Sequence, residues 1–326
     1  MKRIRTAVIG AGYLGKFHLE KLASLPLSSL VSVVDIDLPL ARLLAKRYDI
    51  IALKNYQSLI GKVDAVSIVT PTATHFEIAK FFLDHGAHVF VEKPITLVVE
   101  EANILISLAK AKGLVLQCGH IERFNPGFKF VRPQLSCPVF IEAQRFAPFK
   151  TRGSDISVIF DLMIHDLDII LSIVNSKITS IEAIGANVFT TLFDLANVKI
   201  TFEDGCIAKL AVSRVHASSV RTLSIFQEEG CFYIDMNKNS CHISPMNSAN
   251  HKDTFPFFPA ALLEEISLAK TDALEEELGD YLEAIASKRL PTVSGEDARN
   301  ALALAIQIYD IIARKTQLEA PLLAVG

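Results

Sequence analysis

The feature that most constrains this chain is a short apolar run that leads directly into three spaced glycines. Residues 7–9 are apolar, Gly10-x-Gly12-x-x-Gly15 follows, and a helical pattern then extends from Lys16 to Leu25. A buried strand, a glycine turn and a helix form the first half of a βαβ unit. The first glycine permits the tight turn, the second lets a pyrophosphate approach the backbone, and the third allows close helix packing. The context therefore predicts a dinucleotide site, although glycines at this spacing also occur in ordinary turns.

A second apolar run ends in an acidic residue at a spacing that suits such a site. Residues Leu30–Val34 are followed by Asp35, about 25 residues after Gly10, and a dinucleotide site places an acid at the end of its second strand. A carboxylate there bonds the adenine ribose hydroxyls and repels a 2′-phosphate, so the sequence predicts NAD rather than NADP. The alternative is that Asp35 caps the helix expected over Leu40–Tyr48.

Composition narrows the class of protein. A chain of 326 residues is long enough for about two domains and a sizeable core. The net charge of −3 and the lack of a long basic run argue against nucleic acid as a partner. Charged residues interrupt the apolar segments before roughly 18 residues, which argues against a membrane span. The five cysteines form no CxxC pair, so we expect reduced thiols in a cytoplasmic protein and no metal site.

Strand and helix patterns alternate through the first third of the chain. Beyond Leu30–Val34, strands are expected at Val63–Val69, His88–Val91 and Leu114–Cys118, and helices at His75–His85 and Val98–Lys112. This alternation predicts an α/β fold, with a doubly wound parallel sheet that forms a Rossmann domain over residues 1–119. Ligands of such sheets bind beyond the carboxyl ends of the strands. We therefore expect these cofactor-binding residues: Gly10, Gly12, Tyr13, Leu14, Gly15, Asp35, Thr70, Pro71, His75, Glu92 and Lys93.

The pattern changes after residue 119. A helix is expected over Asp155–Val174, and strands are expected at Val139–Phe146, Ile178–Val188, Ala196–Phe202, Cys206–Val215, Arg221–Gln227 and Cys231–Met236. The sequence thus predicts a second, α+β domain over residues 120–326, built on an open, largely antiparallel sheet. Two helices, Asp272–Lys288 and Gly295–Lys315, are expected to close the chain and pack against its body.

Lys93 is the first candidate catalytic residue. It follows an expected parallel strand and lies between Glu92 and Pro94, and the proline restricts the lysine to an extended backbone. Beside a nicotinamide, its ammonium group could hydrogen-bond a substrate hydroxyl and stabilise alkoxide charge. The alternative is an ordinary surface lysine at the end of a strand.

A second candidate cluster lies on the helix expected over Asp155–Val174. Asp161 and His165 are four residues apart, and His165 and Asp168 are three apart, so each pair shares a helix face. A histidine beside carboxylates can accept a proton, because its ordinary pKa is about 6.5 and a nearby anion raises it. The alternative is a core histidine in a helix salt link.

Four motifs occur in the same order as in a known family of oxidoreductases. They are Gly10-x-Gly12-x-x-Gly15, Thr70-Pro71-Thr72-x-x-His75, Glu92-Lys93-Pro94 and Asp161-x-x-x-His165. Over essentially the whole chain, the sequence resembles the glucose–fructose oxidoreductase/inositol dehydrogenase (Gfo/Idh/MocA) family. The resemblance implies a Rossmann domain, an open-faced sheet domain and self-association through that sheet as a homodimer or homotetramer. It also implies that Lys93, Asp161 and His165 surround the reacting carbon, with His165 as the base.

One segment departs from the family pattern. Residues Gly119–Pro126 read Gly-His-Ile-Glu-Arg-Phe-Asn-Pro, where the family usually has Gly-Phe-Asn-Arg-Arg-Phe-Asp-Pro. With Phe160–Asp168, this variant resembles a bacterial branch that includes UDP-N-acetylglucosamine 3-dehydrogenases. Arg123 suits a phosphate of a nucleotide sugar, and the alternative is that it only pairs with Glu122 or another nearby acid. We expect these substrate-binding residues: His120, Arg123 and Asn125.

The resemblance implies an NAD-dependent oxidoreductase that moves a hydride between a sugar carbon, C3 of a UDP-N-acetylhexosamine, and the nicotinamide. An inositol or simple-sugar dehydrogenase is the first alternative. Reduction of an imine or conjugated double bond is another, although Lys93, Asp161 and His165 favour alcohol chemistry. A dinucleotide-binding protein without catalytic activity is the third, and turnover of a sugar would exclude it.

Overall fold

The chain divides by its internal contacts into two compact units. The computed structural model describes residues 3–150, 156–245 and 264–316. The first unit comprises residues 1–121 and 272–303, and the second comprises residues 122–271 and 304–326. The predicted division assigned everything after residue 119 to one domain. The structure instead returns residues 272–303 to the first unit.

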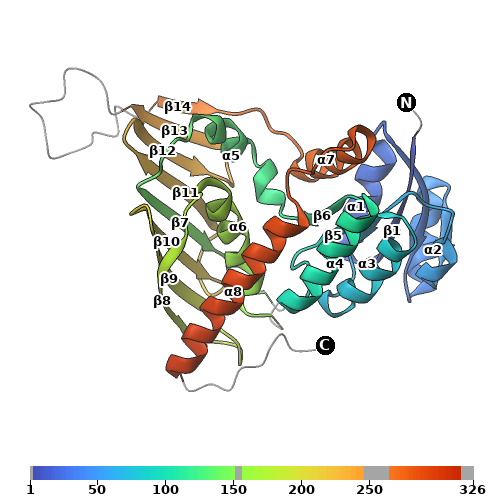
Figure 1. The fold of residues 1–326 in the computed structure, drawn as a ribbon, viewed down its shortest axis with the longest axis horizontal. Coiled ribbons are helices and arrows are strands. Elements are labelled where there is room, and N and C mark those ends of the chain that lie inside the picture. The colour runs from blue at the N-terminus through green and yellow to red at the C-terminus, as the bar shows by residue number, and fades with distance from the viewer. Residues whose placement is uncertain (1–2, 151–155, 246–263, 317–326) are drawn as a thin grey trace, which may run out of the picture. The chain divides into compact units, whose positions relative to one another are not determined.

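The first unit contains a six-stranded sheet in the order β3-β2-β1-β4-β5-β6; β1, β5 and β6 are labelled in Figure 1. All its neighbouring strands are parallel, and this order is that of a doubly wound Rossmann sheet, so the predicted fold class is confirmed. The strands are β1 (Ile4–Ile9), β2 (Ser28–Val34), β3 (Ile51–Leu53), β4 (Ala65–Ile68), β5 (His88–Glu92) and β6 (Leu116–Gly119). The helices between them are α1 (Tyr13–Ser24), α2 (Leu38–Tyr48), α3 (His75–Asp84) and α4 (Val99–Lys112).

Helix α7 (Ala273–Ser287) belongs to the core of the first unit although it comes late in the chain. Leu278, Tyr281 and Leu282 are at most 1% exposed in the same apolar cluster as residues of α1 and β1. The hydroxyl of Tyr281 donates to the carbonyl of Val66 on β4 over 3.2 Å. Burial of these side chains explains why this helix packs with the Rossmann sheet, because removing apolar surface from water is the main stabilising term.

The second unit contains an eight-stranded sheet in the order β14-β13-β12-β11-β7-β10-β9-β8 (Figure 1). Only the pair β7–β10 is parallel, so the sheet is largely antiparallel, as predicted. The strands are β7 (Phe140–Phe146), β8 (Ile178–Ala186), β9 (Leu195–Phe202), β10 (Ile207–Ser213), β11 (Val220–Gln227), β12 (Gly230–Asp235), β13 (Ser240–Pro245) and β14 (Glu264–Ser267). The last two were not predicted from the sequence.

Helices lie on one face of this sheet and leave the other face more accessible. Along β7, alternate residues Ile141 and Ala143 are buried, whereas Phe140 and Glu142 are half-buried, which is the period of a sheet covered on one side. The covering helices are α5 (Pro126–Val131), α6 (Ile164–Ile173) and the second-unit part of α8 (Gly295–Thr316).

The helix predicted over Asp155–Val174 is not uniform. A π-helical turn, Ile159–Met163, precedes α6, and Asp155 lies outside the described residues. Such turns insert a residue into a helix and are frequent at functional sites. Among the described residues, no helix is long and apolar enough to span a membrane, and no three His, Cys, Asp or Glu side chains gather as metal ligands.

Candidate active site

The three glycines after β1 have different structural roles. Gly10 has a φ of +106°, and a Cβ there would lie 2.6 Å from the carbonyl oxygen of Val69. A Cβ at Gly15 would lie 2.0 Å from the carbonyl oxygen of Gly10. Both positions therefore require glycine for the protein's own packing. At Gly12, by contrast, no atom of the described chain lies within 4 Å of a Cβ position, so space remains for a ligand to approach the backbone.

The N-terminus of α1 suits an anionic ligand. Gly12 is its N-cap residue, and within the described residues no side chain caps the helix and no acid lies in its first turn. The first backbone N–H groups of a helix point away from its body, and its dipole favours negative charge there. The pyrophosphate of a dinucleotide fits these donors and the open space over Gly12.

Asp35 is tied to the glycine turn. One carboxylate oxygen accepts from the N–H of Ala11 over 2.6 Å, and the other accepts from the N–H of Asp37 over 2.8 Å. The side chain that caps α2 is Asp37, which accepts from the N–H of Leu40 over 3.1 Å. The alternative that Asp35 is the helix cap is thus not what the structure shows. Asp35 remains partly exposed at the end of β2, where an acid can meet ribose hydroxyls.

Glu92 and Lys93 lie at the end of β5, before a cis Lys93–Pro94 peptide bond. The carboxylate of Glu92 accepts from the N–H of Lys93 over 3.2 Å and lies 3.1 Å from Nε2 of His18. Burial alone would raise the pKa of Glu92, but the contact with His18 and the charge of Lys93 hold that pKa below its usual value. Lys93 is half-buried. A carboxylate and an ammonium group thus follow each other along the chain where β5 ends.

His75 joins the ends of two neighbouring strands. Its Nδ1 lies 2.9 Å from the carbonyl oxygen of Pro94, and its Nε2 lies 2.8 Å from that of Thr70. The side chain is 1% exposed, and burial lowers its pKa. His75 therefore supports the two turns that follow β4 and β5, and a direct contact between its ring and NAD stays a prediction.

Asp161 and His165 lie on an accessible stripe of an otherwise buried helix. From Val158 to Ile170, only Asp161, Leu162 and His165 are partly exposed, and the other residues are buried. Residues four positions apart lie on the same side of a helix. The two polar side chains singled out from the sequence thus lie on the part of this helix that remains accessible.

The other acids of α6 are buried and paired with arginines. Arg123 makes two hydrogen bonds to Asp168, of 2.6 and 2.8 Å. Arg145 on β7 bonds Asp166 through Nε and Nη2, and its Nη1 donates to Glu122 over 2.6 Å. Charged groups are costly to bury unless paired in this way. Burial raises the pKa of Asp166, and the charge of Arg145 opposes that rise.

The three residues predicted to bind substrate are all buried. His120, Arg123 and Asn125 are 1%, 5% and 7% exposed. Asn125 caps α5 by accepting from the N–H of Gly127 over 2.9 Å. The pairing of Arg123 with an acid was the alternative to a phosphate contact, and the acid is Asp168. For Arg123, this geometry favours the ion pair with Asp168 over a contact with a substrate phosphate. Contacts of His120 and Asn125 with a substrate stay predictions.

Comparison with known proteins decides the family. The profile of an oxidoreductase family with an NAD-binding Rossmann fold matches residues 4–120, and that of the Gfo/Idh/MocA C-terminal domain matches residues 136–233. A UDP-N-acetylglucosamine 3-dehydrogenase from Acidithiobacillus ferrooxidans is 40% identical over 309 residues, which cover 94% of this chain and 97% of that protein. The chain belongs to the Gfo/Idh/MocA family. It is an NAD-dependent oxidoreductase, as predicted.

Solved structures agree with this membership of the Gfo/Idh/MocA family. The structure of the A. ferrooxidans protein is 38% identical, has a TM-score of 0.88 and is matched over 98% of this chain and 100% of that chain. A scyllo-inositol 2-dehydrogenase (NAD(+)) from Bacillus subtilis is a weaker relative, 27% identical over 93% of this chain and 92% of its own. Levoglucosan dehydrogenase in complex with NADH, at 16% identity, has a TM-score of 0.85 and is matched over 96% of this chain and 98% of that chain, which concerns the fold only.

Three residues at or beneath this edge of the sheet were not singled out from the sequence of this Gfo/Idh/MocA protein. Ile36 directly follows Asp35 and is 87% exposed. Its position as an apolar residue between two acids could have marked it in the sequence. His18 and Ser67 lie under Glu92, where they form a buried polar pair. Their signal was weak, because a single histidine in a helix and a serine in an apolar strand are common.

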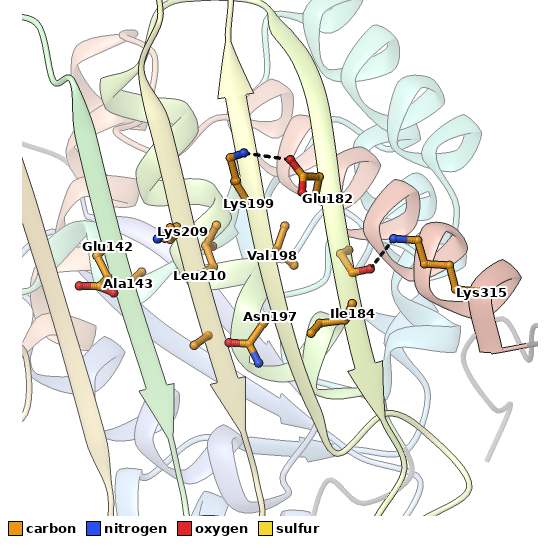
Figure 2. A pocket seen from close by; sticks show the side chains of 12 residues that line it. Glu142, Ala143, Glu182, Ile184, Asn197, Val198, Lys199, Lys209, Leu210 and Lys315 are labelled. Atoms are coloured by element: carbon orange, nitrogen blue, oxygen red, sulfur yellow. Dashed lines mark hydrogen bonds and ion pairs between the residues drawn. The ribbon is translucent and has the colours of Figure 1, made fainter.

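A pocket of about 350 Å³ lies elsewhere, on the accessible face of the second unit's sheet. Charged residues around it include Glu142, Glu182, Lys199, Lys209 and Lys315. Lys199 donates to Glu182 over 2.9 Å, and Lys315 donates to the carbonyl of Ala183; both contacts are drawn in Figure 2. None of its lining residues is a predicted site residue, so we do not assign this pocket to the reaction.

Asp35 provides a direct test of cofactor preference. We expect the wild type to bind NAD more tightly than NADP, because the carboxylate repels a 2′-phosphate. Asp35→Ser should narrow that preference, and Asp37→Ser, which removes a neighbouring negative charge but leaves a hydroxyl that can cap α2, should leave it unchanged. Both dissociation constants can be measured by titration calorimetry. Equal or tighter NADP binding by the wild type would contradict the assignment.

The pair Arg123–Asp168 provides a test of buried charge. Arg123→Met leaves Asp168 buried without its cation, and we expect the free energy of unfolding in urea to fall by about 3–5 kcal/mol. Arg5 and Asp64 form a matched pair with similar bonds of 3.1 and 2.7 Å, but their side chains are 42% and 36% exposed. Arg5→Met should therefore cost much less. Equal losses for the two variants would show that burial of the Arg123 pair does not matter.

Proposed function

We propose that this chain oxidises a UDP-linked N-acetylhexosamine at the sugar 3-hydroxyl, with NAD as hydride acceptor. The observation that carries the proposal is the 40% identity, over 94% of the chain, to the protein named UDP-N-acetylglucosamine 3-dehydrogenase. The inositol dehydrogenase mentioned above is 27% identical over a similar length. The segments Gly119–Pro126 and Phe160–Asp168, which set this chain apart from simple-sugar enzymes, support the same choice.

The first unit fits NAD through its own residues. The open backbone over Gly12 and the N–H groups at the start of α1 suit the pyrophosphate, and the carboxylate of Asp35 suits the adenine ribose. Ile36, exposed beside Asp35, offers an apolar surface to the adenine ring. When bound, NAD supplies the acceptor for the hydride that leaves the sugar carbon.

Three side chains carry the proton chemistry in this proposal. His165 takes the proton of the sugar hydroxyl as the C–H bond yields its hydride, Asp161 orients His165, and the ammonium of Lys93 stabilises the developing alkoxide. Lys93 belongs to the first unit, and Asp161 and His165 belong to the second. The order of their motifs and the accessible stripe on the helix support a shared role.

The diphosphate of such a substrate needs cationic or amide donors, and Arg123 is a weaker candidate than the sequence suggested. Its guanidinium already makes two bonds to Asp168, and its side chain is 3% exposed. We propose that Arg123 anchors α6 and thereby supports the placement of His165. This role requires no contact between Arg123 and the substrate.

We also propose that the chain self-associates through the accessible face of the eight-stranded sheet. Phe140, Phe226 and Tyr233 follow one another across this face at ring-centroid separations of 5.9 and 5.6 Å. Lys199 lies directly opposite Lys209 in the β9–β10 register, and Glu182 and Glu142 lie opposite these two lysines on the neighbouring strands β8 and β7. Half-buried aromatic side chains on an accessible sheet face suit contact with a second copy.

The substrate proposal is tested by NADH formation, followed by absorbance. Purified protein with NAD and UDP-N-acetylglucosamine should form NADH, whereas free N-acetylglucosamine and myo-inositol should not. Lys93→Met and His165→Asn should keep folding and NAD affinity but lower kcat about 10²–10⁴-fold, the usual worth of a positioned acid or base.

His85→Asn is the matched control for these variants, because His85 is an exposed histidine at the end of α3, and it should keep the wild-type rate. NADH from inositol but not from the nucleotide sugar would assign the protein to another branch. Near wild-type kcat for His165→Asn, with chemistry rate-limiting, would require a different base.

Self-association is tested by light scattering after size-exclusion chromatography. We expect a dimer or tetramer for the wild type and a smaller species for Ala211→Arg, because Ala211 lies half-buried on the accessible face of β10. Glu100→Arg, on an exposed position of α4 in the first unit, is the control and should keep the wild-type mass. A monomeric wild type, or an unchanged mass for Ala211→Arg, would contradict the proposed interface.

A further inference from the structure

His18 is a fully buried histidine behind the Lys93 turn. It lies on α1 at 0% exposure, and its ring packs edge-to-face on Phe90 with centroids 5.6 Å apart. Its Nδ1 lies 2.8 Å from Oγ of Ser67 on β4, and its Nε2 lies 3.1 Å from Oε1 of Glu92 at the end of β5. The ring therefore connects the helix of the glycine turn to the ends of two neighbouring strands.

The chemistry of the partners fixes the direction of these hydrogen bonds. A carboxylate only accepts, so Nε2 of His18 carries a proton and donates to Glu92. In the neutral ring Nδ1 is then the acceptor, and the hydroxyl of Ser67 donates to it. Ser67, His18 and Glu92 thus form a chain of donors that ends on the carboxylate beside Lys93.

That carboxylate has little freedom to move. Its Oε2 accepts from the N–H of Lys93 over 3.2 Å, and a Cβ at Gly119 would lie 2.9 Å from Oε2. Glu92 therefore lies directly on the backbone at the end of β6. The hydrogen bond from His18 supplies the remaining constraint and helps to keep Glu92 ionised despite its burial.

We propose that His18 is a positioning residue for Lys93 that acts through Glu92. The fixed carboxylate holds the N–H of Lys93, and His75 holds the carbonyl of Pro94 over 2.9 Å. The backbone is thus held before and after the Lys93–Pro94 bond, which orients the lysine side chain. The inference rests on the proposed role of Lys93 in the reaction. A histidine that only packed α1 on the sheet would affect stability and leave the kinetics unchanged.

His18→Phe tests this role, because it keeps ring packing on Phe90 and removes both hydrogen bonds. We expect kcat to fall about 10- to 100-fold, as for a small misplacement of a catalytic group, while KM for the sugar and the dissociation constant of NAD change little. The pKa of Glu92 should rise without its donor, so the acidic limb of the kcat–pH profile should move to higher pH. His18→Gln, whose amide can donate to Glu92, should recover most of the rate.

His88→Phe is the matched control. His88 is a half-buried histidine of the same sheet whose Nδ1 accepts from the N–H of Val115 over 2.9 Å, so its loss should lower stability without moving the pH profile. The inference would be overturned by wild-type kcat and pH profile in His18→Phe, by no recovery in a folded His18→Gln, or by the same kinetic change in His88→Phe.

The rates are measured with whichever sugar gives the fastest NADH formation, so the result does not depend on the identity of the substrate. Nitrogen-15 spectra of histidine-labelled protein give a second readout that needs no turnover. They should show a proton on Nε2 of His18, whose signals are assigned by their loss in His18→Gln. A ring protonated only at Nδ1 would overturn the inference, whereas a lack of turnover with every sugar would contradict the proposed function instead.

Discussion

The parallel alignment of six strands is the constraint on which the first unit depends. Parallel strands end at one edge of their sheet, so the glycine turn, Asp35, Thr70 and Lys93 gather there although they are far apart in sequence. Hydrogen bonds then fix these turns to one another. Asp35 accepts from the turn after β1, and the ring of His75 lies between the carbonyl oxygens of the turns after β4 and β5. At this edge of the sheet, contacts between the turns that follow the strands therefore limit the backbone motion of each turn.

Buried ion pairs have the corresponding role in the second unit. Asp166 and Asp168 follow His165 by one and three positions along α6, and each accepts hydrogen bonds from an arginine of another element. A buried pair of this kind adds little net stability compared with apolar packing, but loss of one partner is costly because the other charge remains buried. The pairs therefore restrict the rotation and register of α6, and with them the direction in which its accessible stripe faces.

Much of this architecture could be predicted from the sequence, because long apolar runs and glycines carry strong local signals. The parallel strands, the largely antiparallel sheet and the gathering of the glycine turn, Asp35 and Lys93 at one edge of the first sheet followed from them. Short edge strands such as β3 and β14 were missed, since three or four residues give little periodicity. Helix α7 shows an amphipathic pattern, but that pattern does not say which core it joins. The partner of Arg123 is 45 residues away, and only the fold brings the two together.

The central claim is that the hydride comes from C3 of a UDP-linked N-acetylhexosamine. UDP-N-acetylglucosamine with deuterium at C3 tests it most directly, because the label reports which C–H bond is broken. We expect the deuterium to appear at C4 of the nicotinamide in the NADH that forms, while substrate labelled at C4 of the sugar gives unlabelled NADH. Transfer from C4, or no NADH from the nucleotide sugar at all, would contradict the account.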